Sequence, residues 1–106
     1  MKHFLIPTDR GKKNVLENNI IRIEASSNYC RIFFNNEKPL LVAKVLHWFQ
    51  DHLEEDMFCR IHRSHLVNRT HVCEIKNSIL TLSNGDKVQM SRRKRHAGDL
   101  ILKLSA

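Results

Sequence analysis

Apolar and polar residues alternate along most of the chain, which is the pattern of β-strands with one buried face. In the segment at residues 20–25, Ile21 and Ile23 are expected to face the same way, because side chains two positions apart share one face of a strand. Asn84-Gly85 is the strongest hairpin signal in the chain. Short strands are predicted at residues 4–6, 14–17, 20–25, 29–34, 40–42, 57–62, 72–76, 79–83 and 87–90.

The period changes to that of an amphipathic helix in two places. An apolar stripe predicts a first helix from about residue 43 to residue 53: Val42, Val45, Leu46, Phe49 and Leu53. A second stripe predicts a C-terminal helix, with Ser91 placed to cap its N-terminus: Ala97, Leu100, Ile101 and Leu104. The pattern therefore predicts one mainly β domain, residues 1–106, with two small amphipathic helices.

Composition places the chain among ordinary folded proteins, with 106 residues, 42% apolar and 27% charged. No apolar run approaches the roughly eighteen residues that cross a bilayer, so no membrane is expected. The three cysteines cannot all pair within one chain and nothing signals export, so we expect reduced thiols and a cytoplasmic location.

The net charge of +7 is concentrated, since residues 87–95 carry five cations and no acid. Arg92, Arg93, Lys94 and Arg95 lie where the predicted helix begins, and its dipole disfavours cations there. A bound polyanion would explain the run, because free backbone N–H groups attract anions as well. A solvated charge run that keeps a small domain soluble is the alternative.

A second polar cluster lies between apolar residues in the segment from Phe58 to Asn68. We expect His62 and Arg63 to contact a ligand, because Arg pairs with guanine in a bidentate way and His contacts base edges or phosphates. Ser64 is either a contact or a turn former. For Asn68 we favour a structural role, with its side chain bonded to the local backbone.

Metal and catalytic sites have weaker support. Five possible zinc ligands lie within fifteen residues: Cys59, His62, His65, His71 and Cys73. Zinc sites usually present matched ligand pairs, and these pairs are mixed. His62 and His65 would also point to opposite faces if both lay on one strand. The chain has no Gly-rich phosphate loop, HExxH motif or nucleophile elbow. We therefore predict no metal, no cofactor and no enzymatic activity.

Four motifs, in order along nearly the whole chain, resemble the LytTR-type DNA-binding domain, the output module of many bacterial response regulators in two-component systems. They are Ile6-Pro7-Thr8-Asp9-Arg10-Gly11, Ile20-Ile21-Arg22-Ile23-Glu24-Ala25-Ser26-Ser27-Asn28-Tyr29, Phe58-Cys59-Arg60-Ile61-His62-Arg63-Ser64-His65-Leu66-Val67-Asn68 and Val88-Gln89-Met90-Ser91-Arg92-Arg93. The resemblance implies an elongated arrangement of short antiparallel β-sheets, whose loops enter successive major grooves of double-stranded DNA.

Carried over by position, the resemblance implies base contacts from Asn28, Tyr29, Cys30, Arg31, His62, Arg63, Arg92 and Arg93. For phosphate contacts we add Arg69, Lys87, Ser91, Lys94 and Arg95. Cys30 departs from relatives that carry a polar residue there, and a thiol is a weak hydrogen-bonding group, so Arg31 or Asn28 would take over its contact.

The expected function is sequence-specific binding at promoter sites to regulate bacterial transcription. The resemblance allows two further partners: a second copy on tandem repeat sites, and a receiver domain missing from this chain, which begins at Met1 without one. The main alternative is a protein-interaction module or an antagonist of a related DNA-bound regulator. RNA binding is a third hypothesis, with few candidates for base stacking: Tyr29, Phe33 and Trp48.

Overall fold

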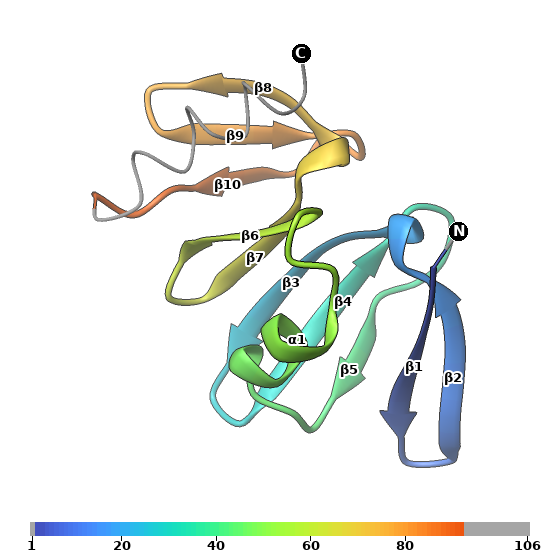
Figure 1. Ribbon diagram of the computed structural model, residues 1–106. Coiled ribbons are helices and arrows are strands. Elements are labelled where there is room, and N and C mark those ends of the chain that lie inside the picture. The colour runs from blue at the N-terminus through green and yellow to red at the C-terminus, as the bar shows by residue number, and fades with distance from the viewer. Residues whose placement is uncertain (1, 93–106) are drawn as a thin grey trace.

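The structure is a computed structural model that describes residues 2–92, and within them the chain forms ten short strands, one α-helix and two 3-10 helices (Figure 1). The elements are β1 (His3–Thr8), β2 (Gly11–Leu16), η1 (Glu17–Asn19), β3 (Ile20–Ser26), β4 (Tyr29–Phe34), β5 (Leu40–Val42), α1 (Leu46–His52), β6 (Phe58–His62), β7 (His65–Asn68), η2 (Arg69–His71), β8 (Val72–Lys76), β9 (Ile79–Leu82) and β10 (Lys87–Gln89). The predicted C-terminal helix and three predicted contacts lie outside the described residues: Arg93, Lys94 and Arg95.

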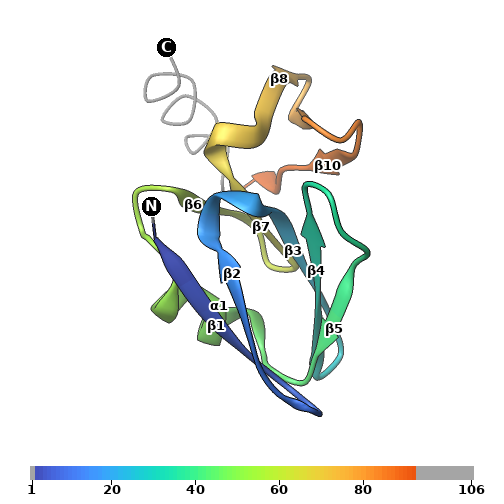
Figure 2. The same cartoon turned by 90° about the vertical axis from the view of Figure 1, so that its right-hand side faces the viewer.

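The strands form three antiparallel sheets, which confirms the mainly β prediction. A five-stranded sheet, ordered β5-β4-β3-β7-β6, is the centre of the molecule. Figures 1 and 2 show the three-stranded sheet β10-β9-β8 at one end of it and the β1–β2 hairpin at the other. The described chain measures 40 × 30 × 24 Å, so the arrangement is elongated, as expected.

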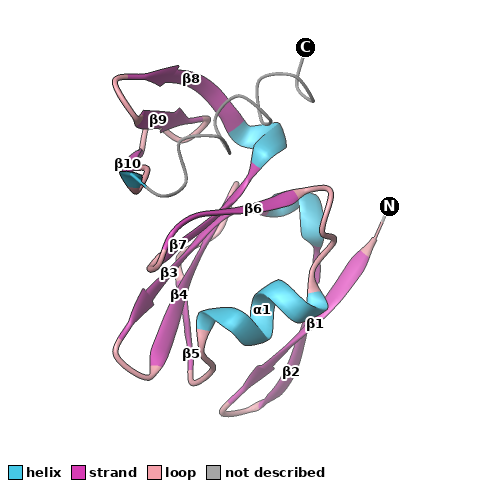
Figure 3. Ribbon diagram, turned by 60° about the vertical axis from the view of Figure 1, so that its left-hand side comes forward, coloured by secondary structure: helices cyan, strands magenta, loops and turns pink. Residues whose placement is uncertain are grey.

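Two separate apolar clusters hold the sheets together. The first lies where α1 packs between the five-stranded sheet and β1 (Figure 3), and it includes the edge-to-face rings of Phe4 and Phe49. The second joins the five-stranded sheet to the three-stranded sheet through Ile21, Ile61, Val67, Leu80, Leu82, Val88 and Met90. Burial of apolar surface is the main force that holds both junctions.

The prediction that Ile21 and Ile23 face the same way is wrong. Both side chains are fully buried, but Ile23 belongs to the first cluster and Ile21 to the second. The register between β3 and β4 shifts between Ile20 and Arg22, so Ile21 is the extra residue of a β-bulge. A bulge breaks the alternation of faces, so side chains of one strand can pack into both apolar clusters.

Two further local predictions have different outcomes. The hairpin at Asn84-Gly85 is confirmed, with the Gly85 N–H donating to the Leu82 carbonyl at 2.9 Å and Gly85 at a φ of +90°. The first helix is shorter than predicted, because Val45 is still extended (φ −79°, ψ 160°) and 55% exposed. The rest of its predicted stripe is buried.

The segment after residue 62 turns back as β7, a strand that the pattern did not predict. Its residues Leu66 and Val67 are fully buried. The structural role of Asn68 is also confirmed: its Nδ2 donates to the Ile20 carbonyl at 2.9 Å, and its Oδ1 accepts from the Thr70 N–H at 3.0 Å. This buried amide therefore joins the end of β7 to the start of β3 and caps η2.

We expect Asn68→Ala to lower the free energy of unfolding by about 1–3 kcal/mol, because it removes the buried hydrogen bond to the Ile20 carbonyl and the cap of η2. Urea unfolding measures the loss, with the exposed Asn36→Ala as the matched control. Equal stabilities of the two variants would contradict the role given to Asn68.

Candidate nucleic-acid interface

Two tight turns lie side by side at one end of the five-stranded sheet. Strand β3 pairs antiparallel with β7, and Glu24 is opposite His65 in that pair. The Ala25 N–H also donates to the Ser64 carbonyl at 2.9 Å. Because β3 continues into the β3–β4 turn and β7 begins after the β6–β7 turn, the turn at residues 27–28 and the turn at residues 63–64 must be neighbours.

A third predicted segment joins them from the three-stranded sheet. The Ser91 N–H donates to the Ile61 carbonyl at 2.8 Å, which holds Ser91 and Arg92 beside the end of β6. Figures 1 and 3 show the β3–β4 turn, the β6–β7 turn and the end of β10 on the same side of the molecule. We call these segments the contact edge: residues 28–31, 62–64 and 91–92.

Arg60 holds the β6–β7 turn from inside, a role that the sequence analysis missed. Its Nη2 donates to the Arg63 carbonyl at 2.6 Å, and its Nη1 donates to Gln50 Oε1 in α1 at 3.2 Å. The guanidinium therefore ties the turn to the helix, while the Arg63 side chain stays exposed. The sequence shows that a cation lies three residues before Arg63, but which groups the Arg60 side chain contacts depends on the tertiary fold.

His62 and His65 face each other across the same turn. They are partners in the register of β6 and β7, with ring centroids 5.1 Å apart, so the expectation that they point to opposite faces is wrong. The Ser64 N–H donates to His62 Nδ1 at 3.1 Å, so the neutral ring carries its proton on Nε2. Among the described residues, no group of three or more possible ligands could hold a metal ion.

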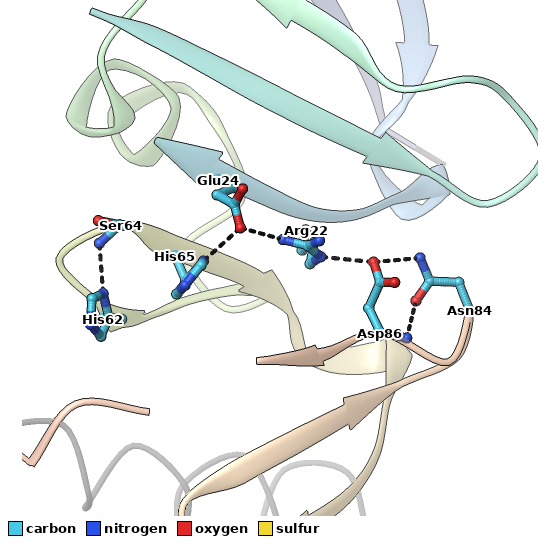
Figure 4. Close-up of polar contacts among 7 residues, drawn as sticks. All are labelled: Arg22, Glu24, His62, Ser64, His65, Asn84 and Asp86. Carbon is cyan, nitrogen blue, oxygen red and sulfur yellow. Dashed lines mark hydrogen bonds and ion pairs between the residues drawn. The ribbon is translucent and has the colours of Figure 1, made fainter. Parts of the chain in front are cut away.

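A chain of charged contacts runs from this turn to the three-stranded sheet (Figure 4). Arg22 donates through Nη1 to Glu24 Oε1 at 3.1 Å and through Nε to Asp86 Oδ2 at 2.9 Å. His65 Nδ1 lies 3.7 Å from Glu24 Oε1, beyond hydrogen-bond distance, so this contact is an ion pair only when the imidazole is protonated.

The side chains of the β3–β4 turn do not all reach the surface. Tyr29 is 47% exposed, and Asn28 and Arg31 are exposed as well. Cys30 is fully buried between its strand partners, and burial raises the pKa of its thiol to about 11. Its predicted base contact is therefore wrong, because alternation along β4 turns this side chain into the core.

The predicted phosphate contacts are divided by the fold. Lys87 is exposed on β10, and Ser91 is half-buried in the contact edge. Arg69 instead follows β7 at the end far from the β6–β7 turn, where its N–H donates to the Met57 carbonyl at 2.9 Å and its Nε donates to the Asp56 carbonyl. Arg69 is thus part of a different region and does not belong to the contact edge.

The β8–β9 turn is a further part of this side that the sequence analysis did not select. Asn77 and Ser78 both have positive φ, 53° and 63°, as a type I′ turn requires. The Ser78 carbonyl accepts from the Met90 N–H at 2.8 Å, so the turn lies next to the 91–92 segment. Lys76 is exposed just before it and adds a cation there.

Comparisons with known proteins bear on the family and the fold of the chain. The family model for the LytTr DNA-binding domain matches residues 12–101. Among solved structures, the chain is similar to the LytTr DNA-binding domain of a protein described as a methyl-accepting/DNA response regulator from Bacillus cereus, with a TM-score of 0.78 and 24% identity over 96% of this chain and 97% of that chain. None of the curated proteins matches the sequence. In the described part of the chain, no helix has the length and apolarity to span a membrane.

The environment of His65 makes stability depend on pH. Burial lowers the pKa of this imidazole below 6.5, although the Glu24 carboxylate opposes the shift. The unfolded chain therefore takes up the proton first, and the contribution of neutral His65 is complete above pH 6.5 and lost as the pH falls below it.

We expect the wild type to lose stability relative to His65→Gln when the pH is lowered from 7.5 to 5.5. Urea unfolding at both pH values gives the difference, in which the titration of all other groups largely cancels. A difference that is independent of pH would show that the fold does not perturb this imidazole.

Proposed function

Since the chain belongs to the LytTR family, whose domains bind DNA to regulate transcription, we propose that the contact edge binds promoter DNA in a sequence-specific way, with its turns in the major groove. The observation that carries this proposal is the meeting of three cation-bearing segments, distant in sequence, on one side of the molecule. The family is one of DNA-binding domains and not of enzymes.

The exposed guanidinium groups suit base recognition. Arg63 and Arg92 are both exposed, and a guanidinium can donate two parallel hydrogen bonds to O6 and N7 of guanine. Arg60 holds the backbone of the β6–β7 turn in place, so less conformational freedom is lost when Arg63 binds. His62 offers its Nε2–H as a further donor to a base edge or a phosphate.

The remaining members of the site complete the proposed interface. Asn28, Tyr29 and Arg31 would contact bases from the β3–β4 turn. Lys87 and Ser91 would contact phosphates. Of the predicted contacts outside the described residues, Arg93 would join the base-contact set and Lys94 and Arg95 the phosphate set. The net charge of +7 favours this surface for a polyanion and predicts affinity that falls with salt.

In this proposal residues 1–106 act as a single output domain. A receiver domain and a second copy on tandem repeat sites would be its partners in a two-component system. Selection of bound sequences from a random duplex pool would identify the operator. Failure to bind any duplex at low salt would contradict the proposal and favour the protein-interaction alternative.

We expect Arg63→Ala and Arg92→Ala each to weaken binding to the selected site by about 1–3 kcal/mol and to relax the preference at one base pair. Gel shifts against single-base variants of the site measure both effects. Lys38→Ala is the control, because Lys38 is exposed in the loop at the other end of β4. Equal losses on selected and random duplex would remove that arginine from the base-contact set.

We expect Lys87→Ala to weaken binding to every duplex alike and to reduce the slope of log affinity against log salt by about one unit. The slope is measured by titration at several salt concentrations on selected and random DNA. A loss confined to the selected site would show that Lys87 contacts a base rather than a phosphate.

A further inference from the structure

The proposed DNA contacts come from two different sheets. The five-stranded sheet carries the β3–β4 and β6–β7 turns, and the three-stranded sheet carries Ser91, Arg92 and the β8–β9 turn. The distance between contacts on the DNA therefore depends on how one sheet is placed against the other. Within each sheet, backbone hydrogen bonds fix the geometry, but between sheets it has to come from other contacts.

The apolar cluster between the sheets does not define that placement by itself, because hydrophobic contact is non-directional. Directional bonds cross the junction at two points of the β10 segment. The Ser91 N–H bonds to the Ile61 carbonyl at 2.8 Å after the strand, and the Asp86 carboxylate accepts from Arg22 Nε at 2.9 Å before it. A third attachment lies at η2, where His71 Nε2 is 2.7 Å from the Asn18 carbonyl oxygen and Nδ1 is 2.7 Å from Ser83 Oγ. Each separate attachment restricts the tilt of the three-stranded sheet further.

The Arg22 side chain is well suited to hold one of these points. It is only 12% exposed, and its guanidinium lies 3.7 Å from the centroid of the Phe33 ring. Its Nη1 also donates to Glu24 at 3.1 Å. A planar cation held by a ring and two carboxylates keeps one orientation, and Figure 4 shows it between β3 and the β9–β10 turn.

The Asp86 side is equally well defined. Asn84 Nδ2 donates to Asp86 Oδ2 at 2.9 Å, and the Asp86 N–H donates back to Asn84 Oδ1 at 3.0 Å. Burial alone would raise the pKa of this carboxyl, but the hydrogen bonds from Arg22 and Asn84 outweigh it and lower the pKa. The carboxylate is therefore charged at neutral pH and available to the guanidinium.

We propose that the Arg22–Asp86 pair is a positioning device that determines which spacing between DNA subsites the domain accepts. This inference rests on the proposed function. Extended chain rises about 3.3 Å per residue, so the five steps from Asp86 to Ser91 span up to about 16 Å. Release of the Asp86 end removes one attachment of the three-stranded sheet, in which β10 stays paired with β9. The sheet can then tilt as a unit about the bond between Ser91 and Ile61, which changes the direction of the 91–92 segment and of the β8–β9 turn relative to the β6–β7 turn.

The test uses the full chain and the duplex selected from a random pool. The two subsites are the base pairs contacted by Arg63 and by Arg92, and assays of Arg63→Ala and Arg92→Ala on single-base variants of the duplex locate them. Insertion or deletion of one base pair between the subsites then shifts one of them by about 3.4 Å along the DNA. We expect wild type to lose at least about tenfold in affinity on the shifted duplexes, as for a mismatched contact. The spacing ratio is the affinity for the selected duplex divided by the affinity for a shifted duplex. For Asp86→Ala we expect this ratio to fall to about threefold or less.

Two further variants keep the test decisive. Glu74→Ala removes the same charge from the exposed surface of the three-stranded sheet, and it should raise affinity for all duplexes without a change in the ratio. Asp86→Asn keeps an acceptor oxygen and should give an intermediate ratio, so it replaces Asp86→Ala if thermal melting shows that the alanine variant is unfolded.

The outcomes separate the two proposals. Wild type that binds no duplex overturns the proposed function and this inference with it. Wild type that binds and discriminates spacing, with both Asp86 variants keeping the full wild-type ratio, overturns only the positioning role. The same ratio change in Glu74→Ala as in Asp86→Ala would also overturn it, because charge alone would then account for the effect.

Discussion

The antiparallel pairing of β3 with both β4 and β7 is the constraint on which the rest of the structure depends. This strand lies in the middle of the five-stranded sheet, and both of its neighbours run opposite to it. Each neighbour is connected through a two-residue turn at the same end of the sheet. The pairing therefore brings two polar turns together, although about 35 residues of sequence separate them. The candidate site is a direct consequence of strand order.

The bulge at Ile21 extends this constraint to the second sheet. It turns one isoleucine of β3 toward the three-stranded sheet while Ile20 and Ile23 stay in the first core. The next residue, Arg22, then lies at the junction and reaches the β9–β10 turn. The bulge thus supplies both an apolar and a polar contact between the two sheets. These contacts hold the turns of the two sheets in a defined arrangement.

The charge distribution around the contact edge follows from the same junction. Glu24 and Asp86 are the carboxylates of the charged network behind the turns, and both accept hydrogen bonds from Arg22. The exposed cations Arg63 and Arg92 are on the outer side, where a polyanion can approach them. Pairing the acidic groups within the fold lowers their repulsion of phosphates, because a paired charge has a weaker field at a distance.

By itself, the sequence determined the features that depend on neighbouring residues: the positions of the strands other than β7, the Asn84-Gly85 hairpin and the polar turn at residues 62–64. Alternation along β4 also placed Cys30 with the core residues, against the contact inferred from family resemblance. Only the tertiary structure decided which distant segments meet. It paired His62 with His65, put Arg69 at the far end of β7 and aimed Arg60 at its own turn. The physical reason is that side-chain periodicity is local, whereas strand order, bulges and register come from contacts between residues far apart in the chain.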